Sequence, residues 1–171
     1  MKQTAPTAVV KMNELQQQID LLAGIRTTPD PVISVYLDLR RETAELKRFV
    51  RRRIAACAKA LPAFQRARLR ACGESVIEQL ADEQVPHAHG LAIFAAADGA
   101  APVLSAMPFA APFRNGLTVS PSPDLFPLLQ LREMYGRFTI ITAQPEGLQV
   151  VEVNLGEVAI RAWAATPKPP S

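Results

Sequence analysis

Cysteine is scarce in this chain, and its scarcity excludes the sites that depend on clustered thiols. Only two of the 171 residues are cysteines, Cys57 and Cys72, and both lie in segments with helical periodicity. Two helical cysteines are too few for a disulfide framework or a zinc site. We therefore expect both thiols to be reduced and to serve as small core residues.

Motifs for nucleotide binding and nucleophilic catalysis are also missing. None of the eight glycines stands next to another, and the sequence has neither a phosphate loop nor a dinucleotide fingerprint. Its serines lack a nucleophile-elbow context, and neither histidine follows the order of a catalytic triad. Glu152 and Glu157 lie near an expected turn and are predicted to face solvent. We therefore predict that the chain is not an enzyme and needs no cofactor.

No uncharged run in the sequence has the character of a membrane helix. The longest weakly charged run is residues 91–113, whose single charged residue is Asp98. Three prolines interrupt it, and Asp98-Gly99 is a strong signal for a tight hairpin turn between two short apolar segments. Two buried strands explain the run better than a bilayer helix does. The N-terminus has too short an apolar stretch for a secretory signal, so we predict a cytoplasmic protein without a membrane partner.

What the sequence does have is a regular succession of hydrophobic patterns. Apolar periods near 3.6 predict helices and periods near 2 predict strands, with Gly and Pro at the breaks. The expected helices are Met12–Ile25, Glu42–Leu61, Phe64–Ala81 and Leu125–Tyr135. The expected strands are Val32–Leu37, Gly90–Ala96, Pro102–Met107, Leu117–Ser120, Phe138–Ala143, Leu148–Asn154 and Val158–Trp163. The first strand is rich in β-branched residues and is predicted to be buried on both faces.

This order of elements predicts an α/β fold. We expect a mixed β-sheet layered with helices, including a long basic antiparallel helical hairpin, followed by a C-terminal β-meander. We assign an N-terminal α/β domain to residues 1–122, a helix and strands of an incomplete second domain to 123–166, and a proline-rich tail to 167–171. Three consecutive strands cannot form a domain alone. Their sheet must pack on the preceding part, pair with another chain or belong to a domain cut short, and an uncovered edge would invite pairing.

Positive charge is concentrated in one segment of the chain. Residues 40–70 hold eleven of the nineteen Lys and Arg residues and only two acids, a local charge of +9 in a chain of net charge +3. Along the helix expected at 42–61, most of these cations lie away from the apolar stripe. The candidate RNA-binding residues are Arg40, Arg41, Lys47, Arg48, Arg51, Arg52 and Lys59. Arg53 falls within the apolar stripe, and we expect its side chain to snorkel past its neighbours.

Three interpretations of this basic helix remain open. Its cations could follow the phosphates of a nucleic acid, which would make binding weaken steeply with salt. They could instead form a solvated helix face, or lie on an anionic membrane surface. Few acids lie nearby to neutralise them, which favours the nucleic acid. No glycine-rich or aromatic single-strand motif accompanies the helix, so base-specific recognition is not predicted.

His87 and His89 form the second candidate site. Side chains at i and i+2 of an extended segment point to the same side, so both imidazoles could reach one metal ion. The third ligand would have to be Asp82, Glu83 or Asp98, none of which lies at a diagnostic spacing. The alternative is two polar residues at the entrance to a strand. We prefer this alternative and predict no metal site.

Several segments together resemble a known family. Residues 31–38, followed by a basic helical pair, and the strand at 90–95 are similar to the opening of bacterial relatives of the archaeo-eukaryotic peptide chain release factor. Residues 123–129, 137–141 and 151–157 are similar to that family's passage into its second domain. The resemblance covers roughly residues 32–158 and rests on hydrophobic patterns.

This resemblance implies ribosome association. The family places its N-terminal α/β domain near the decoding centre and its second domain toward the peptidyl-transferase centre, and it includes Pelota-type rescue factors and hibernation factors. The sequence has neither the Gly-Gly-Gln tripeptide of peptide release nor the Asn-Ile-Lys-Ser element of stop-codon recognition. No catalytic residue is therefore carried over, and the resemblance implies a domain that faces ribosomal RNA.

Three functions follow, in order of preference. The first is a non-catalytic release-factor-like module that associates with the ribosome or ribosomal RNA in termination, rescue or hibernation. The alternative is a protein-interaction or oligomerisation subunit that pairs with itself or with a partner chain through Phe138 to Trp163. The third is a small-molecule enzyme, which would need a concave pocket near His87 and His89.

Overall fold

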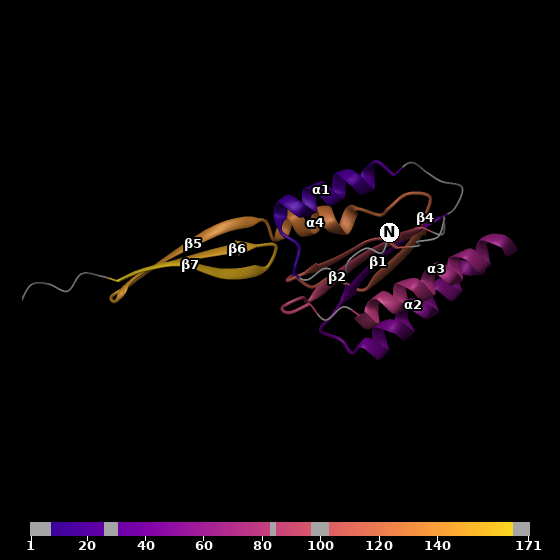
Figure 1. The fold of residues 1–171 in the computed structure, drawn as a ribbon, viewed down its shortest axis with the longest axis horizontal. Helices are drawn as coiled ribbons and strands as arrows, with labels where there is room; N and C mark the ends of the chain where they lie inside the picture. The colour runs from indigo at the N-terminus through magenta and orange to yellow at the C-terminus, as the bar shows by residue number, and fades with distance from the viewer. Residues whose placement is uncertain (1–7, 26–30, 83–84, 97–102, 166–171) are drawn as a thin grey trace, which may run out of the picture.

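The computed structural model of this chain describes residues 8–25, 31–82, 85–96 and 103–165. Within them the chain forms four helices and seven strands, at nearly the bounds that the sequence predicts (Figure 1). The helices are α1 (Met12–Ala23), α2 (Thr43–Ala58), α3 (Ala63–Asp82) and α4 (Phe126–Met134). The strands are β1 (Val32–Asp38), β2 (Gly90–Ala96), β3 (Val103–Phe109), β4 (Gly116–Ser120), β5 (Arg137–Gln144), β6 (Gly147–Asn154) and β7 (Glu157–Ala165).

The first four strands form one sheet in the order β3-β2-β1-β4. The predicted α/β class is confirmed, but every described strand pair is antiparallel, where the sequence analysis expected a mixed sheet. The connection between β1 and β2 explains the difference. A single crossover helix returns the next strand parallel to the first, whereas the α2–α3 pair reverses the chain once more and brings β2 back antiparallel.

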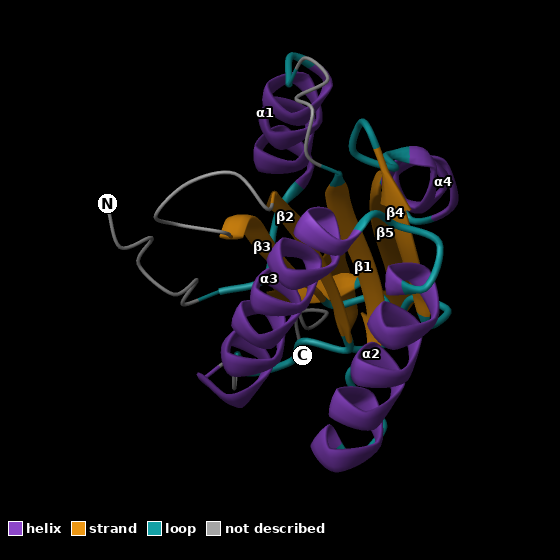
Figure 2. Cartoon of the chain, turned by 90° about the vertical axis from the view of Figure 1, so that its right-hand side faces the viewer, coloured by secondary structure: helices purple, strands orange, loops and turns teal. Residues whose placement is uncertain are grey.

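The sheet lies between two layers of helices. Figure 1 shows α1 and α4 on one side of it and α2 and α3 on the other, and Figure 2 shows α2 and α3 side by side across their face. Side chains alternate along β1, so that one set faces each layer. Ile33, Val35 and Leu37 face α2 and α3, whereas Tyr36 faces α1 and α4. Burial of β1 on both faces is thus confirmed.

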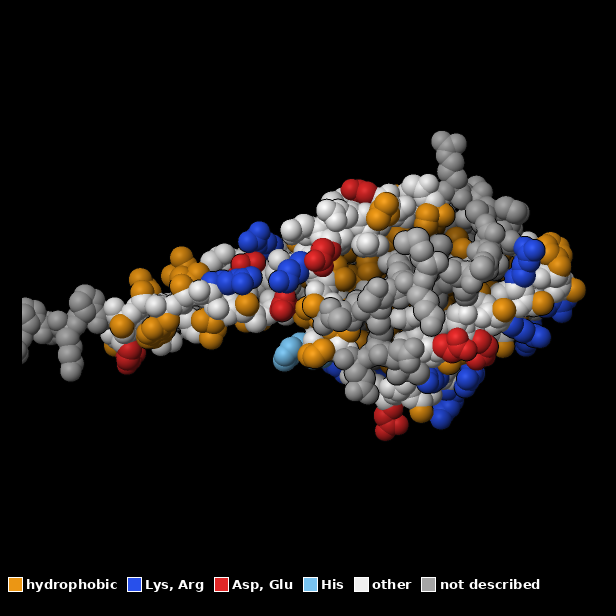
Figure 3. All heavy atoms as spheres, in the orientation of Figure 1, with side chains coloured by type: hydrophobic (Ala, Val, Ile, Leu, Met, Phe, Trp, Pro, Cys, Tyr) orange, Lys and Arg blue, Asp and Glu red, His pale blue; other side chains and the backbone are white. Residues whose placement is uncertain are grey.

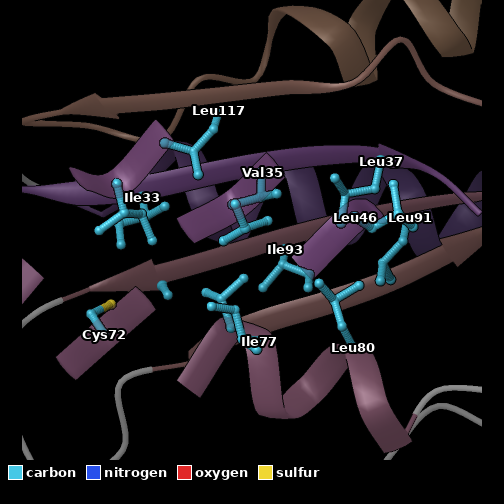
Figure 4. Packing of buried hydrophobic residues seen from close by; sticks show 14 of the residues in the cluster. Ile33, Val35, Leu37, Leu46, Cys72, Ile77, Leu80, Leu91, Ile93 and Leu117 are labelled. Atoms are coloured by element: carbon cyan, nitrogen blue, oxygen red, sulfur yellow. The ribbon is translucent and has the colours of Figure 1, made fainter. Parts of the chain in front are cut away.

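The larger core joins the sheet to the helical hairpin. Figure 4 shows Leu46 of α2 with Ile77 and Leu80 of α3 turned toward the apolar side chains of the sheet. The two helices lie very close together at Gly73, where an added Cβ would meet the Ile54 side chain at 2.2 Å. A side chain at this position would therefore require the Ile54 side chain to move.

Both cysteines lie on this side of the sheet, and neither is in a disulfide bond. Cys72 is buried in the core, where desolvation raises its pKa to about 12. Cys57 is half-buried and packs against the edge of the same core. A thiol with a raised pKa is a poor nucleophile, which agrees with the predicted packing role.

Two hydrogen bonds to Asp124, which lies just before α4, attach this helix to the sheet. The Tyr36 hydroxyl of β1 donates a hydrogen bond to the Asp124 carbonyl oxygen, and the Ser34 hydroxyl accepts one from the Asp124 backbone N–H at 2.9 Å. Burial raises the pKa of Tyr36, and the nearby Asp124 carboxylate raises it further. Ser34 is fully buried and uses its hydroxyl to hold this loop, so it has a structural role in the described residues.

Strands β5, β6 and β7 form a separate antiparallel meander, as predicted. It projects from the three-layer body in Figure 1. We call residues 137–165 the arm. Its eight- and nine-residue strands carry mostly exposed side chains, so no second layer covers it within the described residues.

The β6–β7 turn anchors the base of the arm to the body. Leu155 occupies this turn with a φ of 49°, and its side chain is fully buried in the core between the sheet, α1 and α4. Gly156 follows with a φ of 87° and lies against Ala111. Asn154 accepts a hydrogen bond from the Met12 N–H at the start of α1, at 3.0 Å. Burial of Leu155 offsets the left-handed backbone that a leucine rarely adopts.

Some expectations fall on segments that the structure does not describe. These are the Asp98-Gly99 turn, the break at Pro29-Asp30 and the tail at 167–171. The assignment of residues 1–122 and 123–166 to separate domains stays a prediction. Within the described residues, Leu128 and Leu131 of α4 share a core with the four-stranded sheet.

Replacing Leu155 by Ala should destabilise the whole body. The change leaves a cavity in a closed core, so we expect the free energy of unfolding to fall by about 2–4 kcal/mol. Urea unfolding measured by circular dichroism tests this. Leu21→Ala, at an exposed position of α1, is the control and should cost less than about 0.5 kcal/mol. Equal effects of the two changes would show that the turn is not part of the core.

Candidate nucleic-acid interface

Helix α2 separates its apolar and basic residues onto opposite sides. Leu46, Val50, Ile54 and Ala58 recur at helical spacing and are buried against the sheet and α3. At about 100° per residue, the opposite side of the helix carries cationic residues. Because the sheet takes the apolar side, the basic side is turned away from the body.

Three cations form a row along this outer side. Arg48, Arg52 and Lys59 fall within about 40° of one another on an ideal helix and span roughly 16 Å along its axis. All three are exposed, and none of their side chains forms a hydrogen bond or ion pair with any described residue. Lys47 is half-buried on the flank of the row and also has no such partner in the described part of the chain. We call Arg48, Arg52 and Lys59 the basic row.

The other three predicted RNA-binding residues are paired with carboxylates. The Arg41 guanidinium lies 2.8 Å from Glu45 one helical turn further on, and Arg51 of α2 lies 3.5 Å from Glu74 of α3. Arg40 forms two 2.8 Å hydrogen bonds to Asp38, through Nε and Nη2. Exposed ion pairs of this kind are weak and exchange with solvent. A phosphate would nevertheless have to compete with a carboxylate for each of these three arginines, whereas no described carboxylate is paired with the basic row.

The Asp38 carboxylate is held by a local network at the end of β1. The hydrogen bonds from Arg40 and the charges of Arg40 and Arg41 hold the pKa of Asp38 below its ordinary value of 3.8. The Asp38 backbone N–H donates to the Asn115 side-chain oxygen at 2.7 Å. This bond ties the loop before α2 to the loop before β4.

An open hollow of about 480 Å³ lies beside this network. Its lining is charged and largely positive, from Asp38, Arg40, Arg41, Pro112, Phe113, Arg114 and Asn115. Arg114 is an exposed cation that the sequence analysis did not single out. No local pattern marks it, because only the pairing of β4 with β1 brings residue 114 near residue 40.

The Arg53 side chain extends past its apolar neighbours, as predicted. Its guanidinium Nη2 reaches past the core and donates to the Leu117 carbonyl oxygen of β4 at 3.1 Å. This bond attaches α2 to the edge strand of the sheet, so Arg53 contributes to structure. Figure 3 shows Lys and Arg side chains over the α2–α3 end of the body, with acidic side chains beside them, and further Lys and Arg side chains on the arm near its base.

The structure does not bring the two histidines together as metal ligands. His87 lies in a turn with a φ of 64°, not in the extended segment that would align it with His89. The His89 Nδ1 is instead 2.9 Å from the Ala110 carbonyl oxygen. Among the described residues no three His, Cys, Asp or Glu side chains gather to hold a metal ion. A second hollow, of about 400 Å³, lies next to the two histidines and has no imidazole in its lining, which consists of Leu39, Thr43, Leu46, Leu80, Val85, Pro86 and Ala88.

The fold is similar to that of two archaeal proteins of known structure. One is described only as an archaeal protein and has a TM-score of 0.61 and 14% sequence identity, over 95% of this chain and 47% of its own. The other is an archaeal translation termination factor, aRF1, with a TM-score of 0.60 and 13% identity, over 94% of this chain and 46% of its own. The chain thus spans about half the length of each.

These comparisons define a distant release-factor-like fold. At 13–14% identity the likeness concerns the fold alone. No family model matches the sequence, and no curated protein matches it. The family resemblance is therefore confirmed at the level of the fold. Of the helices described, none is both long enough and apolar enough to cross a bilayer.

Replacing Arg40 by Gln should raise the pKa of Asp38 toward its ordinary value. The lowered pKa means that this carboxylate stabilises the fold at pH values above 3.8, and that the contribution is lost as the pH falls through the lowered value. A carboxyl carbon NMR titration should give a midpoint below 3.8 for Asp38 in the wild type and a higher one in Arg40→Gln. An identical midpoint in both proteins would contradict the assigned cause.

Proposed function

We propose that this chain is a non-catalytic, release-factor-like module that associates with the ribosome by binding ribosomal RNA. The observation that carries the proposal is the basic row, Arg48, Arg52 and Lys59, exposed along one side of α2 without carboxylate partners in the described residues. Lys47 and the ion-paired Arg40, Arg41 and Arg51 would extend the contact when phosphates compete for their carboxylates.

The physical basis of binding is the release of counterions. A polyanion neutralised by a row of cations releases its condensed ions, which makes association favourable at low salt and weaker as salt rises. The row is regular and contains no aromatic residue, so it suits the RNA backbone and not the bases. We therefore expect contacts to phosphates with little preference for sequence.

The structural comparison supports the choice of RNA. The archaeal protein aRF1, whose fold this chain shares at low identity, is a translation termination factor. Ribosomal RNA is the polyanion that a module of this fold would meet. The binding role would be exercised during termination, rescue or hibernation. Cytoplasmic localisation follows from the same proposal.

A second candidate function is protein–protein interaction through residues 138–163. Large apolar side chains are exposed along the arm, among them Ile160 and Trp163. Such surfaces in soluble proteins commonly mark interaction sites. This function is compatible with RNA binding, because α2 and the arm are different parts of the molecule (Figure 1).

Charge reversal at the basic row should strongly weaken ribosome binding. The double variant Arg48→Glu, Arg52→Glu places two repelling charges where phosphates would lie, so we expect at least about a tenfold loss of affinity for ribosomes. Co-sedimentation with purified ribosomes and fluorescence anisotropy with a ribosomal RNA fragment measure it. Both positions are exposed, so circular dichroism should show an unchanged fold.

The matched control reverses two cations on the opposite layer. Lys11→Glu, Arg132→Glu changes the net charge by the same amount, but Lys11 precedes α1 and Arg132 lies in α4. This control should keep most of the wild-type affinity. If both double variants bind equally well, the basic row is not the interface. If both lose binding equally, net charge and not this surface controls the association.

A further inference from the structure

The two faces of the arm differ in chemistry. Strand pairing places Phe138, Val153 and Val158 in one cross-strand row and Ile140, Val151 and Ile160 in another, both on the same face. The irregularity in β7 keeps Trp163 on this face, opposite Gln149. We call this set the apolar face: Phe138, Ile140, Val151, Val153, Val158, Ile160 and Trp163.

The opposite face carries the charges of the arm. Glu152 accepts hydrogen bonds from Arg137 at 3.1 Å and from Arg161 at 2.9 Å. These partners, Arg161 first, hold the pKa of Glu152 below its usual range. Arg161 is the extra residue of the β7 irregularity, which lets it share a face with Glu152. Ion pairs therefore mark this face as the solvated side near the base.

The apolar face is open in the structure. Phe138, Ile140, Val158, Ile160 and Trp163 are between 47% and 67% exposed. The body does not cover it, because the arm projects away from the helical layers, and Figure 3 shows apolar side chains along the arm. A sheet normally packs one face on a second layer about 10 Å away. The missing second layer must therefore come from outside the described residues.

We propose that the second layer is the same face of a second copy of this chain. The face carries no Lys, Arg, Asp or Glu side chain, so stacking two copies buries no unpaired charge. A two-fold contact joins identical patches, here seven apolar side chains together with Thr142 and Gln149, which lie on the same face near the tip. Five large, half-exposed side chains per copy supply roughly 1,000 Å² in total, the lower limit of specific interfaces. The dimer is accordingly a weak one.

The shape of the molecule selects one orientation for this dimer. The bodies would collide if the arms stacked with their bases together, so the tip of one arm lies over the base of the other. Trp163 lies near the tip, in the row next to Leu148, whereas Phe138 and Val158 lie near the base. The two-fold axis then runs across the strands and stacks β7 on β7, so Trp163 of one copy covers Val158 of the other and each copy loses exposed apolar surface.

This inference rests on the second candidate function and is independent of RNA binding. It concerns the apolar face of the arm, whereas the RNA contact concerns α2. The Arg48→Glu, Arg52→Glu variant should therefore dimerise like the wild type. The apolar-face variant described next should keep its affinity for the RNA fragment per chain.

Two isoleucines provide a matched test. Ile160 on the apolar face is 67% exposed, and Ile141 on the opposite face is 68% exposed; both lie in the edge strands β5 and β7. Ile160→Lys places a charge in the stacked layer and should weaken the dimer by at least about tenfold. Ile141→Lys should leave it unchanged. Sedimentation velocity of the full chain over a range of micromolar concentrations measures both.

The fluorescence of Trp163 provides a second readout, because it is the only tryptophan of the chain. In the wild type its emission should shift to shorter wavelength as the concentration rises, and this shift should be absent in Ile160→Lys. A wild type that stays monomeric at every concentration overturns the proposal, as does a dimer that survives Ile160→Lys. Equal weakening by Ile141→Lys would place the contact on the other face or at the strand edges and would also overturn it.

Discussion

The burial of β1 on both faces determines how the rest of the body is arranged. Ile33, Val35 and Leu37 require an apolar layer on one side, and α2 and α3 supply it. Once the apolar side of α2 is taken, its cationic side has only solvent or a partner to face. The basic row is therefore a consequence of core packing, and a polyanion is the partner that its charge favours.

The arm, in contrast, has an apolar face that no second layer covers within the described residues. Leu155 and Asn154 attach its base firmly to the body, so the arm is held in one place relative to the helices. Beyond that base, the sheet has an ion-paired face and an apolar face but no second layer. The structure thus combines a body whose apolar surfaces are satisfied with an extension whose apolar face is not. The two proposed contacts, with RNA and with a second copy, arise from these two parts.

Local patterns were sufficient to predict every described helix and strand, because an apolar face repeats with a period near 3.6 or 2 along the sequence even where, as in β5, the strand stays exposed. Relations between distant segments were not predictable in this way. The expected mixed sheet was wrong even though the helical hairpin was predicted, because the hairpin itself returns β2 antiparallel to β1 and every described strand pair is antiparallel. The pairing of Arg51 with Glu74 depends on how α2 packs on α3, and Arg114 reaches the basic hollow only through the sheet. The left-handed backbone of His87 removed the extended geometry on which the metal hypothesis rested.

The salt dependence of RNA affinity tests the proposed interface most directly. If the basic row and Lys47 each neutralise one phosphate, the plot of log affinity against log salt should have a slope of roughly −3. Removing the charges of Arg48 and Arg52 by substitution with Gln should make the slope about half as steep. An affinity that hardly changes with salt, or a slope that is the same in the wild type and in this variant, would contradict an RNA contact through α2.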